Sequence, residues 1–191
     1  MNISKLAEFA SNIVFCRSLL GFGKNRGGIV KLDQLSQIHV SGIVGNTRGL
    51  LHESDVKALQ AFGAALQQMF AINLAAGATV TASNIRGEIE SLYDPAKLLD
   101  DDRYSYWATD DDVTTADVTF DLKQEKTFNV IRLRENIMIG QRVEAFAVDA
   151  WQNGAWQEIA KGTSIGANRL IRLPSNIKTT KVRVRITKSP V

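Results

Sequence analysis

Hydrophobic residues change their spacing along the chain near Gly77, from the period of a helix to the period of strands. In residues 53–70 they recur every three or four positions, which places them on one face of an amphipathic helix. A helix with one apolar face has to bury it, and no neighbouring segment is an obvious partner, so the pattern indicates that a neighbouring domain is missing. The members of this apolar stripe are Val56, Leu59, Phe62, Leu66 and Met69.

Beyond Gly77, apolar and polar residues alternate in short segments, which is the pattern of half-buried strands. The alternation slips at Val130-Ile131, which predicts a bulge, and Asn153-Gly154 predicts a hairpin turn. Strands this closely spaced, with no helical pattern between them, predict an antiparallel β-sandwich. The predicted strands are residues 78–83, 117–122, 128–135, 142–151, 156–160, 170–173 and 181–187.

Length and charge exclude several classes of protein. A (β/α)8 barrel needs about 250 residues, and this chain has 191. The formal net charge is +3, but residues 1–48 contain six basic and two acidic residues, so the positive charge belongs to this segment alone. Its basic residues are scattered without a nucleic-acid-binding motif, and no apolar run is long enough to span a bilayer. The sequence therefore predicts neither nucleic acid nor a membrane as a partner.

Residues that could catalyse a reaction form no recognisable set. Cys16 is the single cysteine, which excludes an intramolecular disulfide, and as a nucleophile it would need His39 or His52 as its base. A small buried residue is the simpler interpretation of Cys16. The glycine-rich residues 21–28 match no phosphate-binding loop, because Arg26 stands where a dinucleotide fingerprint has glycine and no Gly-Lys-Ser/Thr follows. No catalytic residue is predicted.

Two aspartate triplets, residues 100–102 and 110–112, could hold a cation or belong to solvated turns. Consecutive carboxylates repel each other, so they need solvent, basic partners or a metal ion. Calcium prefers carboxylate, hydroxyl and backbone oxygens on a loop, and Ser105 follows the first triplet closely. Both interpretations stay open. A pair of glycosidase carboxylates is not expected, because these loops are polar and show no apolar pocket that would raise a pKa.

Aromatic residues beside the first triplet are the candidates for contact with sugar rings, because aromatic faces stack on the apolar faces of sugars. Tyr104 and Tyr106 are expected to be exposed and are the sugar-binding candidates. Trp107 and Trp156 are expected to fill the core instead.

The segment around the first triplet resembles a known family. Residues 98–109, LLDDDRYSYWAT, resemble the Leu-Asp-Gly-Asp-x-x-Thr-x-Trp signature of discoidin domains, also called coagulation factor 5/8 type C domains, and Ala82-Ser83 matches their early Ala-Ser. Further motifs resemble the C-terminal part of family 29 α-L-fucosidases, including the end of their catalytic barrel. They are NTRGLLHESDV (46–56), IRLRE (131–135), GQRV (140–143), GAW (154–156) and IAKGTSIG (159–166).

The resemblance covers residues 46–187 and implies a mainly β fold, a galactose-binding-like jelly-roll sandwich over residues 77–187. Residues 46–76 would correspond to the end of the catalytic barrel and the amphipathic helix that leads out of it. Residues 1–45 stay without an assigned element, as an irregular segment. Family members continue into one more strand after Ile186, so this sandwich is expected to lack its last strand.

The resemblance also implies a structural calcium ion, held by Leu99, Asp100, Asp102 and Ser105. Two of the signature positions differ in this chain. Asp101 stands in place of glycine, and Ser105 in place of threonine. Glycine adopts a positive φ without penalty and aspartate does so at some cost, so the loop is expected to be altered.

For function, the resemblance implies an accessory carbohydrate-binding module of an α-L-fucosidase-like glycoside hydrolase. Family members carry their catalytic carboxylates on an upstream barrel that this chain does not contain, so its own activity is left open. The expected partners are fucose- or galactose-containing glycans and the missing barrel domain. Two alternatives stay open: a free-standing carbohydrate-binding lectin module, and a structural domain that binds no ligand. The parent family is usually secreted, periplasmic or lysosomal, but residues 1–45 show no signal peptide, so the compartment is not assigned.

Overall fold

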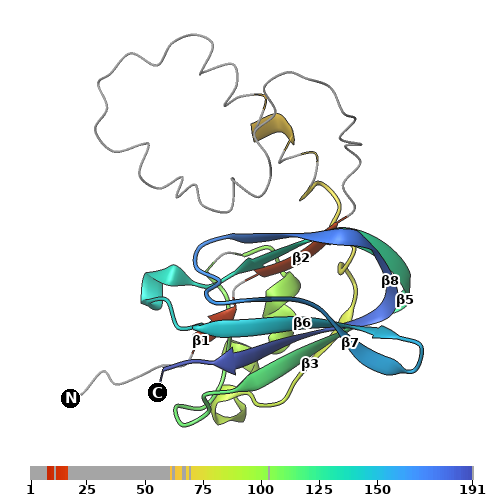
Figure 1. Ribbon diagram of the computed structural model, residues 1–191. Helices are drawn as coiled ribbons and strands as arrows, with labels where there is room; N and C mark the ends of the chain where they lie inside the picture. Colours follow the sequence, from red (N-terminus) through yellow and green to blue (C-terminus); the bar gives the residue numbers. More distant parts are fainter. Residues whose placement is uncertain are drawn as a thin grey trace, which may run out of the picture. The chain divides into compact units, whose positions relative to one another are not determined.

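The structure is a computed structural model and describes residues 8–10, 12–16, 61, 63–65, 68, 70–102 and 104–190 (Figure 1). The chain divides into two compact units, and each is described by itself. One unit consists of Met1–Arg17 together with Asn73–Val191, and the other of Ser18–Ile72.

In the second unit, the described part of the predicted helix 53–70 is helical: residues 61, 63–65, 68 and 70. The apolar stripe of that helix lies outside the described residues. Its burial against a partner therefore stays a prediction.

The first unit consists mainly of antiparallel strands joined by short helical turns. The helical turns are η2 (Arg86–Glu88), α3 (Glu90–Tyr93), η3 (Pro95–Leu99) and η4 (Ile137–Ile139). The strands are β1 (Glu8–Ala10), β2 (Asn12–Cys16), β3 (Thr79–Ala82), β4 (Trp107–Ala108), β5 (Ala116–Arg134), β6 (Ala145–Gln152), β7 (Ala155–Gly162) and β8 (Arg169–Lys188). The predicted mainly β, antiparallel fold is confirmed.

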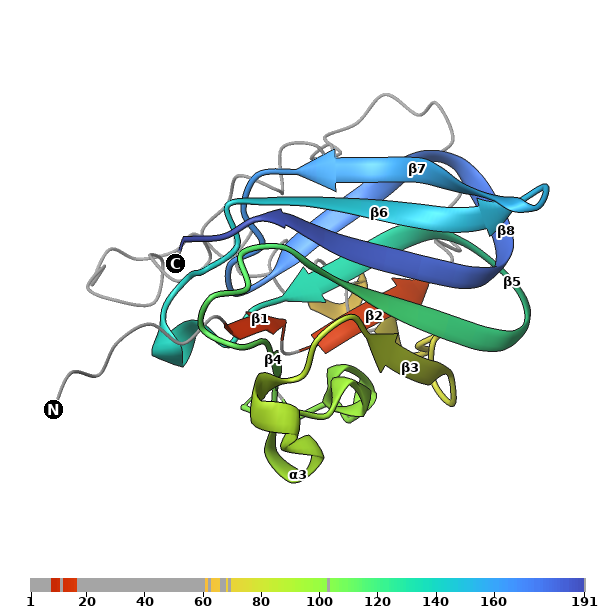
Figure 2. The ribbon, with the colours of Figure 1, turned by 90° about the horizontal axis from the view of Figure 1, so that it is seen from below.

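Two long strands, β5 and β8, pair with each other along most of their length and bend from one layer of the sandwich into the other (Figure 2). The bend coincides with a shift of register between Asp121 and Lys126. One layer contains β3, the first half of β5, the second half of β8, β6 and β7. The other contains β2, the second half of β5 and the first half of β8. The sequence predicted four separate strands here, because the polar residues at the bends interrupt the alternation.

Smaller features of the pattern are also found in the structure. The register of β5 against β8 shifts between Phe128 and Val130, beside the predicted bulge. Asn153 and Gly154 have φ values of 54° and 78°, as a two-residue turn of the I′ kind requires, so the predicted β6–β7 hairpin is confirmed.

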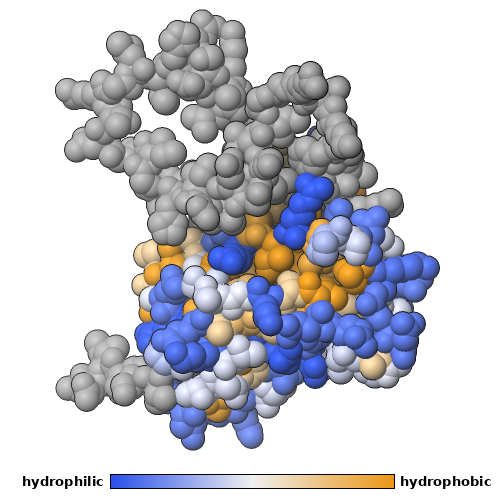
Figure 3. Space-filling view, viewed as in Figure 1, coloured by the Kyte–Doolittle hydropathy of each residue, from blue (hydrophilic) through white to orange (hydrophobic). Residues whose placement is uncertain are grey.

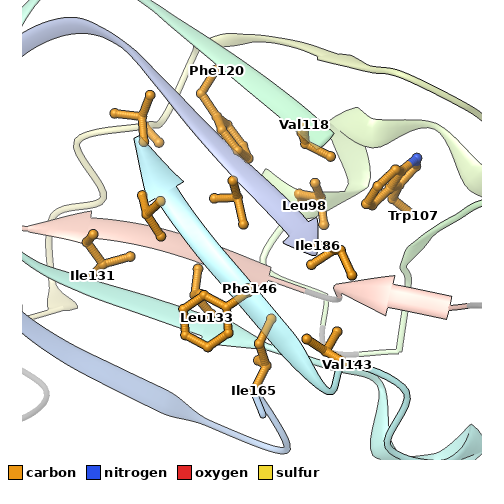
Figure 4. Close-up of a cluster of buried hydrophobic side chains, with 14 of the residues drawn as sticks. Leu98, Trp107, Val118, Phe120, Ile131, Leu133, Val143, Phe146, Ile165 and Ile186 are labelled. Atoms are coloured by element: carbon orange, nitrogen blue, oxygen red, sulfur yellow. The ribbon is translucent and has the colours of Figure 1, made fainter. Parts of the chain in front are cut away.

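The core lies between the two layers and is built from the alternating apolar positions of the strands (Figure 4). Trp107 is 1% exposed and closes one end of the core, as predicted, and its indole N–H donates to the backbone oxygen of Asn84 at 2.9 Å. The strands contribute Val118, Phe120, Leu122, Phe128, Ile131, Leu133, Phe146, Val148, Val182, Val184 and Ile186.

The core prediction for Trp156 was wrong. The register between β6 and β7 shifts by one residue: Val148 is opposite Ala160, but Asp149 is opposite Glu158. An extra residue in one strand places the side chains before it and after it on opposite faces relative to an unbroken alternation, and Trp156 precedes the extra residue in β7. Trp156 therefore lies opposite Trp151 on the outer face, with the two ring centroids 5.3 Å apart.

The edges of the sandwich differ from the sequence prediction. β8, the last strand, lies between β5 and β6 and is therefore central. An edge position beside β5 is occupied by β2, which comes from the residues without an assigned element. The absence of a further closing strand stays a prediction.

Polar side chains cover most of the described surface on the face shown in Figure 3, and hydrophobic side chains gather there in one band. Among the helices in the described part of the chain, none is long and apolar enough to cross a membrane.

Candidate functional site

A pocket of about 220 Å³ opens between the loop that precedes β4 and the loop that follows β5. One wall is formed by Tyr104, and the other by the end of β5 and the η4 turn. The lining combines an aromatic ring, hydrophobic side chains and hydrogen-bonding groups, as in many small-molecule sites. The lining residues are Tyr104, Arg134, Glu135, Asn136, Ile137, Met138 and Ala167.

Glu135 holds three segments of the pocket together. Its side chain is buried, and its Oε1 accepts hydrogen bonds from the backbone N–H groups of Arg142 at 2.8 Å and Val143 at 2.9 Å. Its Oε2 accepts another from the backbone N–H of Gly166. A buried carboxylate is stable only when its oxygens have donors, and these three backbone groups supply them. Glu135 is therefore a structural part of the pocket wall.

Asn136 joins the two walls. Its Nδ2 donates to the backbone oxygen of Tyr104 at 3.2 Å, and its Oδ1 accepts from the backbone N–H of Met138 at 3.3 Å, at the start of η4. Tyr104 is 64% exposed and Met138 is 78% exposed. The rim of the pocket thus presents an aromatic and an aliphatic side chain on a backbone fixed by hydrogen bonds.

The two sugar-binding candidates lie in different surroundings. Tyr104 is exposed and lines the pocket. Tyr106 is partly buried, and its ring centroid lies 5.8 Å from that of Tyr93 at an angle of 44°. The structure therefore brings only Tyr104 into the pocket, and the expected exposure of Tyr106 is found only in part.

The predicted calcium ligands lie at the end of η3, at Leu99, and on the turn that follows it, where Asp100 and Asp102 accept hydrogen bonds from atoms of their own loop. Asp100 accepts from the N–H of Asp102 at 2.9 Å and from the Ser105 hydroxyl at 2.6 Å, and Asp102 accepts from the N–H of Tyr104 at 2.9 Å. Asp101 has φ of 62°, a conformation that glycine adopts more easily.

The oxygen donors of this turn, Leu99, Asp100, Asp102 and Ser105, suit calcium chemically, but calcium usually binds six to eight oxygens. In the described residues, no three His, Cys, Asp or Glu side chains gather in a way that could hold a metal ion. The side chains alone therefore fit a calcium ion only in part, and backbone oxygens such as that of Leu99 would have to complete the set.

The second aspartate triplet binds a distant loop. Asp110 accepts from the backbone N–H of Gly87 at 2.7 Å and from the Asn84 amide at 2.9 Å, and its own N–H donates to the Asn84 Oδ1. Arg86 forms a salt bridge with Asp111 at 2.6 Å. The Gly87 N–H and the Asn84 amide lower the pKa of Asp110, and the Arg86 guanidinium lowers the pKa of Asp111. These contacts give Asp110 and Asp111 a structural role.

A third polar cluster lies on the outer face of β6, β7 and β8. The buried Asp149 carboxylate accepts from Arg183 Nε at 2.9 Å and from Arg185 Nε at 2.7 Å. Burial raises the pKa of Asp149, but the hydrogen bonds from the two guanidinium groups outweigh it, so the pKa is lowered overall. Arg183 also stacks on Trp156 at 4.6 Å from the ring centroid. The cluster is an internally paired ladder across three strands.

Comparison with known proteins identifies the sandwich. Residues 79–190 match the F5/8 type C domain. The chain belongs to this family. The F5/8 type C domain here is similar to domains found in fucosidases. The chain is 42% identical over 130 residues to "Putative alpha-L-fucosidase 1" of Oryza sativa subsp. japonica, covering 68% of this chain and 25% of that protein.

Two further fucosidases are similar to this chain. "Alpha-L-fucosidase 1" of Arabidopsis thaliana is 30% identical over 146 residues, covering 75% of this chain and 29% of that protein. A GH29 fucosidase of Ruminococcus gnavus, solved in complex with fucose, has a TM-score of 0.63 and 30% identity over 75% of this chain and 29% of that one. The chain thus spans less than a third of the length of these relatives. The resemblance to the C-terminal part of family 29 fucosidases is confirmed.

The sequence did not single out Glu135 and Asn136 as residues of the site. The available signal was weak: two polar residues directly follow the apolar end of a strand. Their roles come from partners far along the chain, since Asn136 binds Tyr104 and Glu135 binds Gly166.

Proposed function

We propose that the F5/8 type C domain of this chain is an accessory carbohydrate-binding module of an α-L-fucosidase-like protein. The observation that carries the proposal is the pocket beside Tyr104, where an exposed aromatic ring lies next to hydrogen-bonding groups on a fixed backbone. Aromatic faces next to polar groups suit a sugar, which has apolar faces and hydroxyl groups. The fucosidase relatives favour a glycan that contains fucose or galactose. Hydrolysis of fucosides is not proposed for this chain, because it spans less than a third of the length of such relatives.

Titration calorimetry of the full chain with fucose- and galactose-terminated oligosaccharides tests this function. Tyr104→Ala should weaken binding by about tenfold, which corresponds to about 1.4 kcal/mol. Tyr104→Phe keeps the ring and should retain most of the affinity. Trp151→Ala removes an exposed aromatic side chain on a different face and serves as the matched control. Equal losses in Tyr104→Ala and Trp151→Ala would argue against this pocket.

The alternatives give distinguishable results in the same experiment. Binding by this chain alone, with no fucosidase barrel on the protein from which it derives, favours the free-standing lectin. Absence of heat across all fucose and galactose glycans favours a structural domain without ligand.

We also propose that the turn after η3 binds calcium weakly through Leu99, Asp100, Asp102 and Ser105. The support is its set of hard oxygen donors, which is the chemistry that calcium prefers. Millimolar calcium should raise the melting temperature of the native chain and have a smaller effect on Asp102→Asn, as measured by differential scanning fluorimetry. Equal behaviour of the two proteins with and without calcium would reject this site.

A further inference from the structure

The edge of β4 and the edge of the second half of β5 are both occupied by a segment from the other end of the chain. β2 pairs with β5 in an unbroken antiparallel register, from Asn12 opposite Arg134 to Cys16 opposite Val130. Just before it, β1 pairs with β4, with Glu8 opposite Ala108 and Ala10 opposite Trp107. Figure 2 shows β1 beside β4 and β2 in the sheet with β5. Residues 8–10 and 12–16 thus pair with two edges in succession.

This segment does not belong to the matched domain. The F5/8 type C match begins at residue 79. Residues 1–17 nevertheless group with the sandwich, while Ser18–Ile72 forms a unit of its own. The position of β1 and β2 is therefore set by strand pairing and not by a short connection to β3.

The edge needs an occupant. β5 is paired with β8 on one side over residues 130–133, and β2 supplies the pairing on the other side. Ile131 and Leu133 in this stretch, and Trp107 in β4, belong to the buried core. An open edge at this point would leave backbone N–H and C=O groups without partners directly beside the core, and such edges tend to recruit strands.

We propose that the edge of β4 and β5 is a strand-acceptor site, which binds an extended segment through its backbone, and that residues 8–16 of the same chain are its occupant. The sequence of β2, Asn-Ile-Val-Phe-Cys, is rich in residues that favour strands. The chemistry is that of β-augmentation, in which main-chain hydrogen bonds to a sheet edge hold a separate strand. Because the occupant is tethered only through a long connection, a free peptide of the same sequence should be able to replace it.

The cost of closing a long connection rises only slowly with its length, so residues 17–78 do not prevent pairing within one chain. A tether of this kind gives an effective concentration on the order of a millimolar. Occupation by the chain's own segment is therefore favoured over occupation by a second copy at ordinary protein concentrations.

The strand-acceptor site also borders the candidate pocket beside Tyr104. β5 continues directly into Glu135 and Asn136, and Tyr104 lies three residues before β4. The two strands that receive residues 8–16 therefore lead into opposite walls of the pocket. The proposal does not depend on any ligand of that pocket, so its test needs none.

Hydrogen exchange of the full chain, read by mass spectrometry, tests the acceptor site. Consecutive N–H groups of a strand point to opposite sides, so either Ile13 or Val14 directs its N–H toward β5. Proline removes that group, so Ile13→Pro or Val14→Pro should speed exchange of those amides among residues 130–134 that point toward β2 by about tenfold or more. Lys5→Pro, outside both strands, is the matched control and should exchange like the native chain.

Unchanged exchange over residues 116–121 in the proline variants would show that the rest of β5 remains folded, so a general loss of structure can be recognised. If neither variant alters exchange over residues 130–134 relative to Lys5→Pro, residues 8–16 are not the occupant and the proposal fails.

A peptide of residues 6–18, with Cys16→Ser to prevent oxidation, then tests exchange of the occupant. Added at up to about 1 mM to whichever proline variant, Ile13→Pro or Val14→Pro, shows faster exchange, it should restore slow exchange over residues 130–134. A scrambled peptide of the same composition should not. Failure of the native sequence to restore protection, or equal restoration by the scrambled peptide, would overturn the acceptor site.

Light scattering over a range of concentrations distinguishes the source of the strand. The native chain should remain monomeric. A dimer that is lost in the disrupted proline variant would show that residues 8–16 of a second copy occupy the edge, which contradicts the assignment to the same chain.

Discussion

The two aspartate triplets are identical in sequence and opposite in structural role. In residues 100–102, the carboxylates of Asp100 and Asp102 accept hydrogen bonds from atoms two to five residues away in the same loop. In residues 110–112, Asp110 binds Asn84 and Gly87, which are 26 and 23 residues away. The first triplet shapes its own turn, and the second fastens two loops to each other. Three consecutive aspartates therefore say little about function until their partners are known.

The difference follows from what lies beside each triplet. The Asn84 side chain donates from Nδ2 to the Asp110 carboxylate and accepts at Oδ1 from the Asp110 N–H. Its backbone oxygen accepts from the indole N–H of the buried Trp107. Asn84 thus connects the second triplet to the core. Among the described residues, the first triplet has no such connection, and its oxygens accept hydrogen bonds only from atoms of its own turn.

The largest effect is expected from Asn84→Ala. This change removes both side-chain hydrogen bonds to Asp110 and should lower the free energy of unfolding by on the order of 1–2 kcal/mol, since each bond contributes about 0.5–1.5 kcal/mol. Urea unfolding followed by tryptophan fluorescence measures it. A matched change in an exposed turn, Asn153→Asp, keeps a residue that tolerates positive φ and should have little effect. Similar stabilities of Asn84→Ala and the native chain would show that the second triplet does not fasten the loops.

The second largest effect is expected from acid, which should reduce the contribution of Asp110 to the stability of the folded chain. The pKa of Asp110 is lowered in the folded chain by the Gly87 N–H and the Asn84 amide, so its contribution is present above the ordinary value of 3.8 and is lost as the pH falls through the lower folded value. The stability advantage of the native chain over Asp110→Asn should therefore shrink as the pH is lowered from about 5 toward 2. Urea titrations of both proteins across this range measure it, and a constant difference would contradict the ionised role of Asp110.

Sequence periodicity predicted the parts of the fold that depend on local alternation. Val118, Phe120 and Leu122 face the core because they alternate with polar residues, and Asn153-Gly154 turns the chain because both residues accept positive φ. Trp156 was misplaced because β7 contains one extra residue between Glu158 and Ala160, so side chains before and after it lie on opposite faces of the sheet.

Of the candidate site, the sequence predicted only the residue whose role follows from its exposure. Tyr104 could be proposed as an exposed aromatic beside a polar turn, and it lines the pocket. Glu135 and Asn136 could not, because their roles depend on hydrogen bonds to Gly166 and Tyr104, 31 and 32 residues away. The pairing of β2 with β5 depends on contacts even more distant in sequence, which no local pattern reports.

Replacing the middle aspartate of the first triplet by glycine should stabilise the chain, unlike a glycine replacement in the second triplet. Asp101 has φ of 62°, where aspartate is less favourable than glycine. Asp101→Gly should relieve this strain, offset in part by the greater freedom of glycine in the unfolded chain, for a net gain of about 0.5 kcal/mol. Thermal unfolding of the two proteins measures it. Asp112→Gly applies the same replacement in the second triplet, at a residue with no positive φ, and should not stabilise the chain. A lower melting temperature for Asp101→Gly would mean that the aspartate side chain contributes more than its backbone conformation costs.

The smallest effect is expected from Ser105→Ala, and it decides whether the first triplet is as local as its contacts suggest. The change removes the Ser105 hydroxyl, which donates to the Asp100 carboxylate at 2.6 Å and lies 3.2 Å from a second acceptor, the Asp102 backbone oxygen, on an exposed turn where water can replace it. Stability should fall by no more than about 0.5 kcal/mol, well below the effect of Asn84→Ala. Parallel urea titrations of the two variants make the comparison directly. A loss in Ser105→Ala equal to that in Asn84→Ala would place the first triplet, too, among the contacts that hold the fold, because an exposed local bond alone cannot account for it.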